Sequence, residues 1–123
     1  MNQSSEHPLI PAERVNGTDV YGQDGAKVGK IEDLAIDKES GLVAYAIIGF
    51  GGLLGVGERY APVPWSVLRY DTEKRGYVTP LPTQALKEAP SFEPRELSGW
   101  SDSHSRDRLY NYYAAYGASP YWL

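Results

Sequence analysis

Short apolar runs separated by turns rich in glycine and proline fill most of the first ninety residues. The pattern predicts six strands, in residues 18–21, 27–37, 42–50, 59–63, 68–71 and 77–79. Asp24-Gly25 predicts a tight hairpin between the first two, and the nearly continuous apolar run of residues 42–50 is typical of the most buried strand of a small barrel. Pro62 and Pro64 predict that the fourth strand lies at an edge or ends there. The pattern therefore predicts an all-β fold, a small, partly open antiparallel β-barrel.

Helical signals are shorter and come mostly after the strands. Residues 64–68 suit a single helical turn that opens with proline, and residues 83–88 form a short helix that Pro90 stops. A further helix begins at a cap, Ser101 or Asp102, and ends at Gly117. Its apolar positions recur at intervals of three and four residues: Leu109, Tyr112, Tyr113 and Tyr116. Because tyrosine buries a ring and keeps a wet hydroxyl, this face is expected to form a partly exposed seam.

Composition divides the chain of 123 residues into three zones around one domain. Residues 1–8 are a flexible polar lead, residues 9–90 the barrel domain, and residues 91–123 an aromatic C-terminal extension with one helix. The absence of cysteine excludes disulfides and thiolate metal sites. A net charge of −4 has the wrong sign for a protein that neutralises phosphates, so direct binding of nucleic acid is not expected.

Nothing in the sequence predicts a targeting or membrane-spanning segment. The N-terminus lacks the basic and apolar regions of a secretory signal. Glycines break the longest apolar stretch, Leu42 to Leu54, which is far shorter than the roughly 20 residues of a transmembrane helix. We expect a cytoplasmic protein that reaches the inner membrane only as a peripheral component, through a partner.

Several segments together carry a family resemblance: Gly22 to Asp37, Gly41 to Ile48, the glycine-rich residues 49–57, Ala61 to Leu68, Ala89 to Phe92, and the terminal Tyr112-Tyr113 and Pro120-Tyr121-Trp122. Over roughly residues 9–123 the chain resembles stand-alone bacterial members of the PRC-barrel family, named for the cytoplasmic domain of the photosynthetic reaction-centre H subunit.

The resemblance implies a partly open β-barrel that binds other macromolecules. The H-subunit domain packs beneath a membrane complex, and a similar domain of a ribosome-maturation factor helps to bind a ribosomal protein. The expected partner is thus an unidentified protein, at a membrane complex or a ribosome. The chain departs from both relatives, since it shows neither the transmembrane helix of the first nor the additional N-terminal domain of the second.

The glycine-rich loop at residues 49–57 leaves three interpretations open. It is a flexible hairpin tip, or an apolar protrusion that docks on another chain through Leu53, Leu54 and Val56. A phosphate cradle is the third, although the loop lacks both the P-loop pattern and a true G-x-G-x-x-G.

Two clusters of polar residues invite chemical interpretations. Glu32, Asp33, Asp37 and Glu39 are turn and rim residues, with Asp37 bonding back to the turn that Gly41 completes, or else a weak divalent-cation site. Residues 101–107 contain serine, histidine and aspartate, but no G-x-S-x-G elbow accompanies them, so a helix cap is favoured over a hydrolase triad. With only two histidines in the chain, no metal site is expected.

The aromatic C-terminal third also leaves three interpretations open. It folds back over its own barrel, crosses to a second subunit, or binds a flat ligand. The aromatic residues expected to contact a partner are Trp100, Tyr112, Tyr113, Tyr116, Tyr121 and Trp122.

These observations favour a non-enzymatic protein-interaction module, a homodimeric adaptor with no cofactor and no catalytic residue. The alternative is a sensor that binds a small ligand or an anion in the barrel cleft, lined by Tyr45, Tyr60 and Trp65.

Overall fold

The computed structural model describes residues 9–50, 59–90 and 103–118 of the 123. Its elements in chain order are α1 (Ala12–Val15), β1 (Asp19–Tyr21), β2 (Lys27–Ile36), β3 (Val43–Gly49), β4 (Tyr60–Pro64), the 3-10 turn η2 (Trp65–Val67), β5 (Arg69–Asp71), β6 (Gly76–Val78), α2 (Thr83–Glu88), α3 (Ser103–Tyr113) and η4 (Ala114–Tyr116). The six strands lie where the apolar pattern predicts them. Helix α1, which follows Pro11, is not predicted by the sequence pattern.

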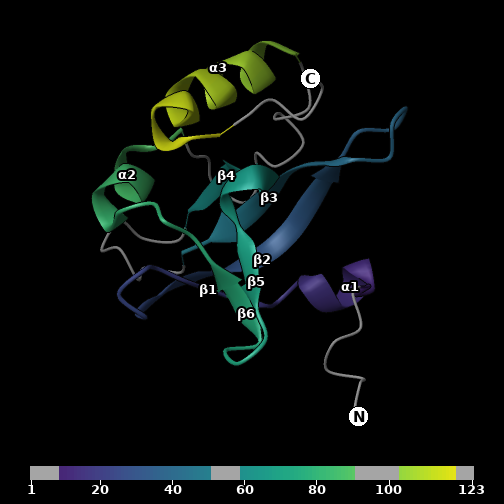
Figure 1. Ribbon diagram of the computed structural model, residues 1–123. Coiled ribbons are helices and arrows are strands. Elements are labelled where there is room, and N and C mark those ends of the chain that lie inside the picture. The colour runs from purple at the N-terminus through teal and green to yellow at the C-terminus, as the bar shows by residue number, and fades with distance from the viewer. Residues whose placement is uncertain (1–8, 51–58, 91–102, 119–123) are drawn as a thin grey trace.

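The strands form one six-stranded sheet in the order β4-β3-β2-β1-β6-β5 (Figure 1). Neighbours pair antiparallel, as predicted, except β1 and β6, which run parallel with Val20 opposite Tyr77. The sheet is therefore mixed, because β6 returns beside the first strand in the same direction. It does not close, since β4 and β5 remain as its two edges. The all-β, partly open architecture is confirmed.

Strand β4 shows how proline positions fit an edge. Pro62 lies opposite Ile47 and Pro64 opposite Tyr45 in the ladder with β3. Proline has no N–H to donate to a neighbouring strand, so both residues suit only a strand whose outer side carries no further partner. The chain leaves the sheet directly after Pro64, in the turn η2. The edge position predicted from the two prolines is confirmed.

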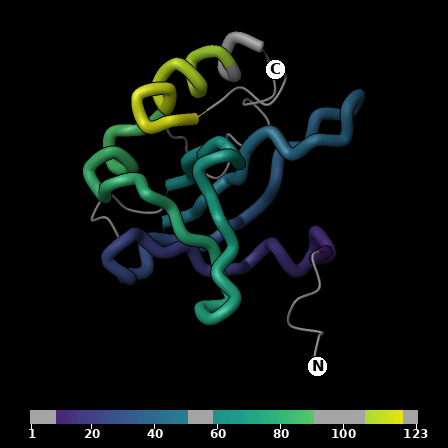
Figure 2. The backbone as a smooth tube through the Cα atoms, in the orientation of Figure 1, coloured from purple at the N-terminus to yellow at the C-terminus, as the bar shows by residue number. Residues whose placement is uncertain are grey.

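The hydrophobic core lies between the sheet and the helices that follow it. Strand β3 is buried from Ala44 to Gly49, as the apolar run predicts. Helix α3 lies along one side of the sheet with α2 beside it, and α1 lies apart from them near β2 (Figures 1 and 2). Leu109 and Tyr113 of α3 are completely buried and belong to the same core cluster as Ile31 and Ile48. The C-terminal helix thus contributes to the core of the barrel.

Candidate functional site

The hairpin formed by β2 and β3 extends beyond the strands on either side of it. On the β1 side, backbone pairing stops at Ile31, which bonds Thr18 and Gly17. On the β4 side it stops at Tyr45, opposite Pro64. Residues 32–44 therefore form a two-stranded projection, which we call the arm, and Figures 1 and 2 show it in blue reaching away from the rest of the sheet.

The tip of the arm is a turn held by hydrogen bonds among its own residues. The Asp37 N–H donates to the Leu42 carbonyl (2.9 Å), and the Gly41 N–H donates to the Asp37 carbonyl (2.9 Å). One carboxylate oxygen of Asp37 accepts from the N–H groups of Glu39 and Ser40, both at 2.9 Å. Gly41 has a φ of +79°, a conformation that favours glycine. The turn chemistry predicted for Asp37 and Gly41 is confirmed, and it gives the tip a defined shape.

The base of the arm is fixed to the sheet by a bulge. The register shifts between Ile31 and Asp33, so that Glu32 has no partner residue on β3. The Glu32 side chain lies across Gly49, where an added Cβ would come within 2.7 Å of the glutamate Cγ. The Asp33 carboxylate accepts from the Leu34 N–H at 2.8 Å. The Asp33 carboxylate thus helps to shape the backbone at the base of the arm.

Apolar side chains remain exposed at the outer end of the arm. Ile36, the last residue of β2, and Leu42, the residue before β3, are each 51% exposed. They lie on the two sides of the turn. Ile36 is paired across the hairpin with Val43, the residue that follows Leu42. Leu34 and Ala35 behind them are partly buried against the core. A projecting hairpin with a hydrogen-bonded turn and an apolar tip is a candidate docking element.

The tyrosines of α3, by contrast, make contacts within their own chain. The Tyr110 hydroxyl donates to the Ala44 carbonyl at 2.5 Å, and the Tyr112 hydroxyl donates to the Ala85 carbonyl of α2 at 2.6 Å. Tyr112 also packs against Tyr113 and Tyr116, with ring centroids 5.0 and 6.0 Å away. These contacts match the interpretation in which the aromatic segment folds back over its own barrel.

Tyr113 lies deeper than the predicted seam. It is completely buried, and its hydroxyl has no hydrogen-bond partner in the described structure. Burial above all, and then the neighbouring Tyr112 and Tyr116, raise the pKa of Tyr113 far above its ordinary value of 10.0. Tyr113 therefore presents no surface in the single chain, whereas Tyr116 remains exposed and Tyr112 is half-buried. The predicted partly exposed seam is correct only for these last two.

The three residues of the predicted ligand cleft are not gathered at one place. Tyr45 lies opposite Pro64, the residue that precedes Trp65 in the chain. Tyr60 lies opposite Gly49. Four residues along β3 separate the two tyrosines, about 13 Å at the usual rise of a strand. Trp65 packs instead against Tyr77, with ring centroids 5.3 Å apart. A ligand at these residues stays a prediction.

Six residues of the predicted partner surface lie outside the described residues: Leu53, Leu54, Val56, Trp100, Tyr121 and Trp122. The predicted helix caps Ser101 and Asp102 and the polar lead, residues 1–8, lie outside them as well. Their roles stay predictions.

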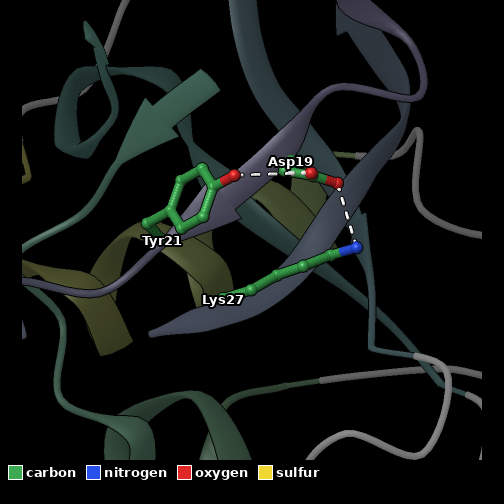
Figure 3. A network of polar contacts seen from close by, with 3 residues as sticks. All are labelled: Asp19, Tyr21 and Lys27. Carbon is green, nitrogen blue, oxygen red and sulfur yellow. Dashed lines mark hydrogen bonds and ion pairs between the residues drawn. The ribbon is translucent and has the colours of Figure 1, made fainter. Parts of the chain in front are cut away.

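A second polar cluster lies near the opposite end of β2. Figure 3 shows Lys27, whose Nζ pairs with Asp19 at 3.1 Å, and Tyr21, whose hydroxyl donates to the same carboxylate at 3.5 Å. The Nζ of Lys74 lies 5.0 Å from the centre of the Tyr21 ring, which is a cation–π contact. These charges satisfy one another at the surface, and such pairs add little stability. The ion pair between Lys27 and Asp19 is neutral, and Lys74 adds one positive charge beside it.

The acidic residues of the arm also received a metal interpretation from the sequence. In residues 9–50, 59–90 and 103–118, no three histidine, cysteine, aspartate or glutamate side chains gather as a metal-binding set. Asp33 and Asp37 instead accept backbone N–H groups.

Sequence reasoning missed the two exposed residues of the arm, Ile36 and Leu42. The available signal was a difference in strand length, since the predicted second strand is more than twice as long as the first. The longer strand must extend past the end of the shorter one, and an apolar residue in the extending part has no neighbouring strand to cover it. Tyr110 was missed too, because its partner Ala44 lies 66 residues away along the chain.

An open, mostly antiparallel six-stranded sheet with a protruding hairpin and a packed C-terminal helix defines a small domain of the partly open β-barrel type. A comparison with models of protein families matches the PRC-barrel domain at residues 8–86, so the chain belongs to the PRC-barrel family. No curated protein matches the chain. None of the helices in the described part of the chain is long and apolar enough to span a bilayer.

Proposed function

We propose that this PRC-barrel chain is a non-enzymatic interaction module that recruits another protein through the arm. The observation that carries the proposal is the exposure of Ile36 and Leu42 at the end of a hairpin that is ordered by its own turn. A preformed turn loses little conformational entropy when it docks. The same small apolar contact therefore contributes more to affinity than it would from a loop that must first become ordered.

The proposal includes the homodimer expected from the sequence, formed away from the arm. Tyr112 of α3 and Tyr116 of η4 support it, because their ring centroids lie 6.0 Å apart and Tyr116 remains exposed. Aromatic rings of this kind are enriched where protein surfaces meet. Sedimentation of the Tyr116→Asp variant tests this part: we expect a monomer where the unaltered chain is a dimer, and an unchanged dimer would exclude this contact.

Quantitative affinity capture from native lysate, with membrane and ribosomal fractions kept separate, tests the recruitment. The bait is the full chain, compared with a variant that carries Ile36→Asp and Leu42→Asp. We expect the variant to lose the proteins that the unaltered chain enriches while keeping its unfolding midpoint. Equal capture by both baits would contradict recruitment through the arm.

A matched control places the same charges elsewhere. Leu53→Asp with Leu54→Asp alters the other predicted protrusion and leaves the arm intact. Loss of capture in the arm variant alone supports the arm as the recruiting surface. Loss only in the loop variant would assign recruitment to Leu53 and Leu54 instead.

A further inference from the structure

Most of the net charge of the protein lies on the arm. Residues 32–44 contain four acidic side chains, Glu32, Asp33, Asp37 and Glu39, and one basic side chain, Lys38, which gives a net charge of −3. The whole chain carries −4, so the other 110 residues together carry only −1. The element with the uncovered apolar tip is therefore also the strongly charged part of the molecule.

Three of the four acidic residues, Asp33, Asp37 and Glu39, lie close to the apolar tip along the chain, and the carboxylates of the two aspartates are held by backbone hydrogen bonds. Asp33 lies on β2 behind Ile36, and its carboxylate is bonded to the Leu34 N–H. Asp37 lies between Ile36 and the turn, and its carboxylate accepts two N–H groups of that turn. Glu39 is exposed on the turn itself. Negative charges thus precede and follow the exposed Ile36 along the hairpin.

We infer that the partner of the arm is a protein with a basic surface around a small apolar pocket, which receives Ile36 and Leu42. This inference rests on the proposed function and adds the chemistry of the partner. Complementary charge accelerates encounter and excludes wrong partners, while burial of the two apolar side chains supplies the short-range attraction. The acidic side chains of the arm would repel an anionic surface.

The same charges argue against a second copy of this chain as the occupant. Two arms that met tip to tip would bring two groups of net charge −3 together. An arm that met another face of a second copy would make a head-to-tail contact, which forms a ring or an open chain of subunits rather than a simple pair. A basic partner of different sequence satisfies both the charge and the apolar tip.

Three synthetic peptides with the same leucine pattern and with lysine, glutamine or glutamate at every polar position provide a direct probe. Binding to the isotope-labelled full chain is followed by amide chemical shifts and fluorescence anisotropy. We expect the lysine peptide to bind most tightly, to shift the amides of residues 32–44, and to weaken at least tenfold in Ile36→Ser with Leu42→Ser. Binding of the glutamate peptide with equal affinity, or shifts confined to the barrel body, would overturn the inference.

Charge variants separate the inference from the proposed function. Glu32→Gln with Glu39→Gln removes two charges from the arm without touching the carboxylates that hold its backbone, and we expect a threefold to tenfold loss of affinity for the lysine peptide at low salt that disappears at high salt. The matched control, Asp24→Asn with Glu73→Gln, removes the same charge from the turns beside β1 and β6 and is expected to change affinity less than twofold. An equal loss in both variants would overturn the inference.

The same variants in the lysate experiment complete the test. If the apolar variant loses capture and the Gln variant does not, recruitment through the arm stands and the basic partner is excluded. If neither variant changes capture, both the proposed function and the inference fail. Arm-dependent self-association in sedimentation would likewise exclude the basic partner, because a second copy would then be the occupant.

Discussion

Helix α3 and the β2–β3 arm differ in the burial of their apolar residues. Helix α3 lies in the aromatic third of the sequence, yet Leu109 and Tyr113 are completely buried, and Tyr110 and Tyr112 donate their hydroxyl protons to carbonyls of the same chain. The arm contains no aromatic residue, and its two aliphatic tip residues remain exposed. The density of apolar residues in a sequence therefore does not locate a free surface. An apolar residue is exposed or buried according to whether a neighbouring helix or strand packs against it.

The largest expected difference comes from the same substitution in the two regions. Leu109→Ala removes a completely buried side chain from α3 and is expected to lower the free energy of unfolding by about 3 kcal/mol. Leu42→Ala on the arm is the matched control and is expected to change it by less than about 0.5 kcal/mol. Urea unfolding followed by circular dichroism measures both. Similar losses in the two variants would show that the arm packs against something in the free protein.

The hydroxyls of α3 are expected to differ from one another. Tyr110→Phe leaves the buried Ala44 carbonyl without its donor and should cost about 1–2 kcal/mol of unfolding free energy. Tyr113→Phe removes a buried hydroxyl that has no hydrogen-bond partner among the described residues, so it should leave stability unchanged or raise it by up to about 1 kcal/mol. Chemical denaturation of the two variants in parallel checks this. A larger loss for Tyr113→Phe than for Tyr110→Phe would contradict the assignment of the two hydroxyls.

The shape of the arm depends on Gly41. Alanine at a φ of +79° is strained, and Gly41→Ala should lower the free energy of unfolding by about 1 kcal/mol and speed amide exchange in the turn. Gly41→Asn is the matched control, since asparagine tolerates this conformation better and should cost less. Hydrogen exchange of residues 37–42 gives the local effect. Unchanged exchange in Gly41→Ala would show that the turn forms without glycine.

The smallest effect is an alkaline loss of stability that originates in α3. Because the pKa of Tyr113 is raised in the folded protein, the unfolded chain releases this proton first, so stability is retained below about pH 10 and falls as the pH rises above it. Tyr113→Phe should make the fall between pH 9 and about pH 11 shallower, while Leu42→Ala should follow the unaltered chain. Denaturation midpoints over this range provide the measurement. Parallel profiles for all three proteins would exclude this origin.

Much of the fold follows from local patterns, whereas the arrangement of the two regions does not. Alternation predicts the strands, Pro62 and Pro64 predict the edge, and Asp37 with Gly41 predicts the turn of the arm. The spacing of Leu109, Tyr112, Tyr113 and Tyr116 predicts α3, but which tyrosine is buried depends on contacts with Ala44 and Ala85, far away along the chain.

The candidate surface illustrates the same limit. Ile36 and Leu42 have the apolar character of core residues, and alternation alone assigns them to a strand face. Their exposure results from where β1 and β4 stop on either side of the hairpin. The parallel pairing of β1 with β6 is likewise a contact between distant segments, which a local pattern does not encode.

The two prolines of β4 also bear on how the protein behaves at high concentration. An edge strand with free N–H groups offers a template on which strands of other molecules can grow into insoluble aggregates. At Pro62 and Pro64 the outer side of β4 has no hydrogen to donate, so this edge resists such growth. Backbone chemistry thus protects the β4 edge against strand addition, directly beside the β2–β3 hairpin whose tip carries the exposed Ile36 and Leu42.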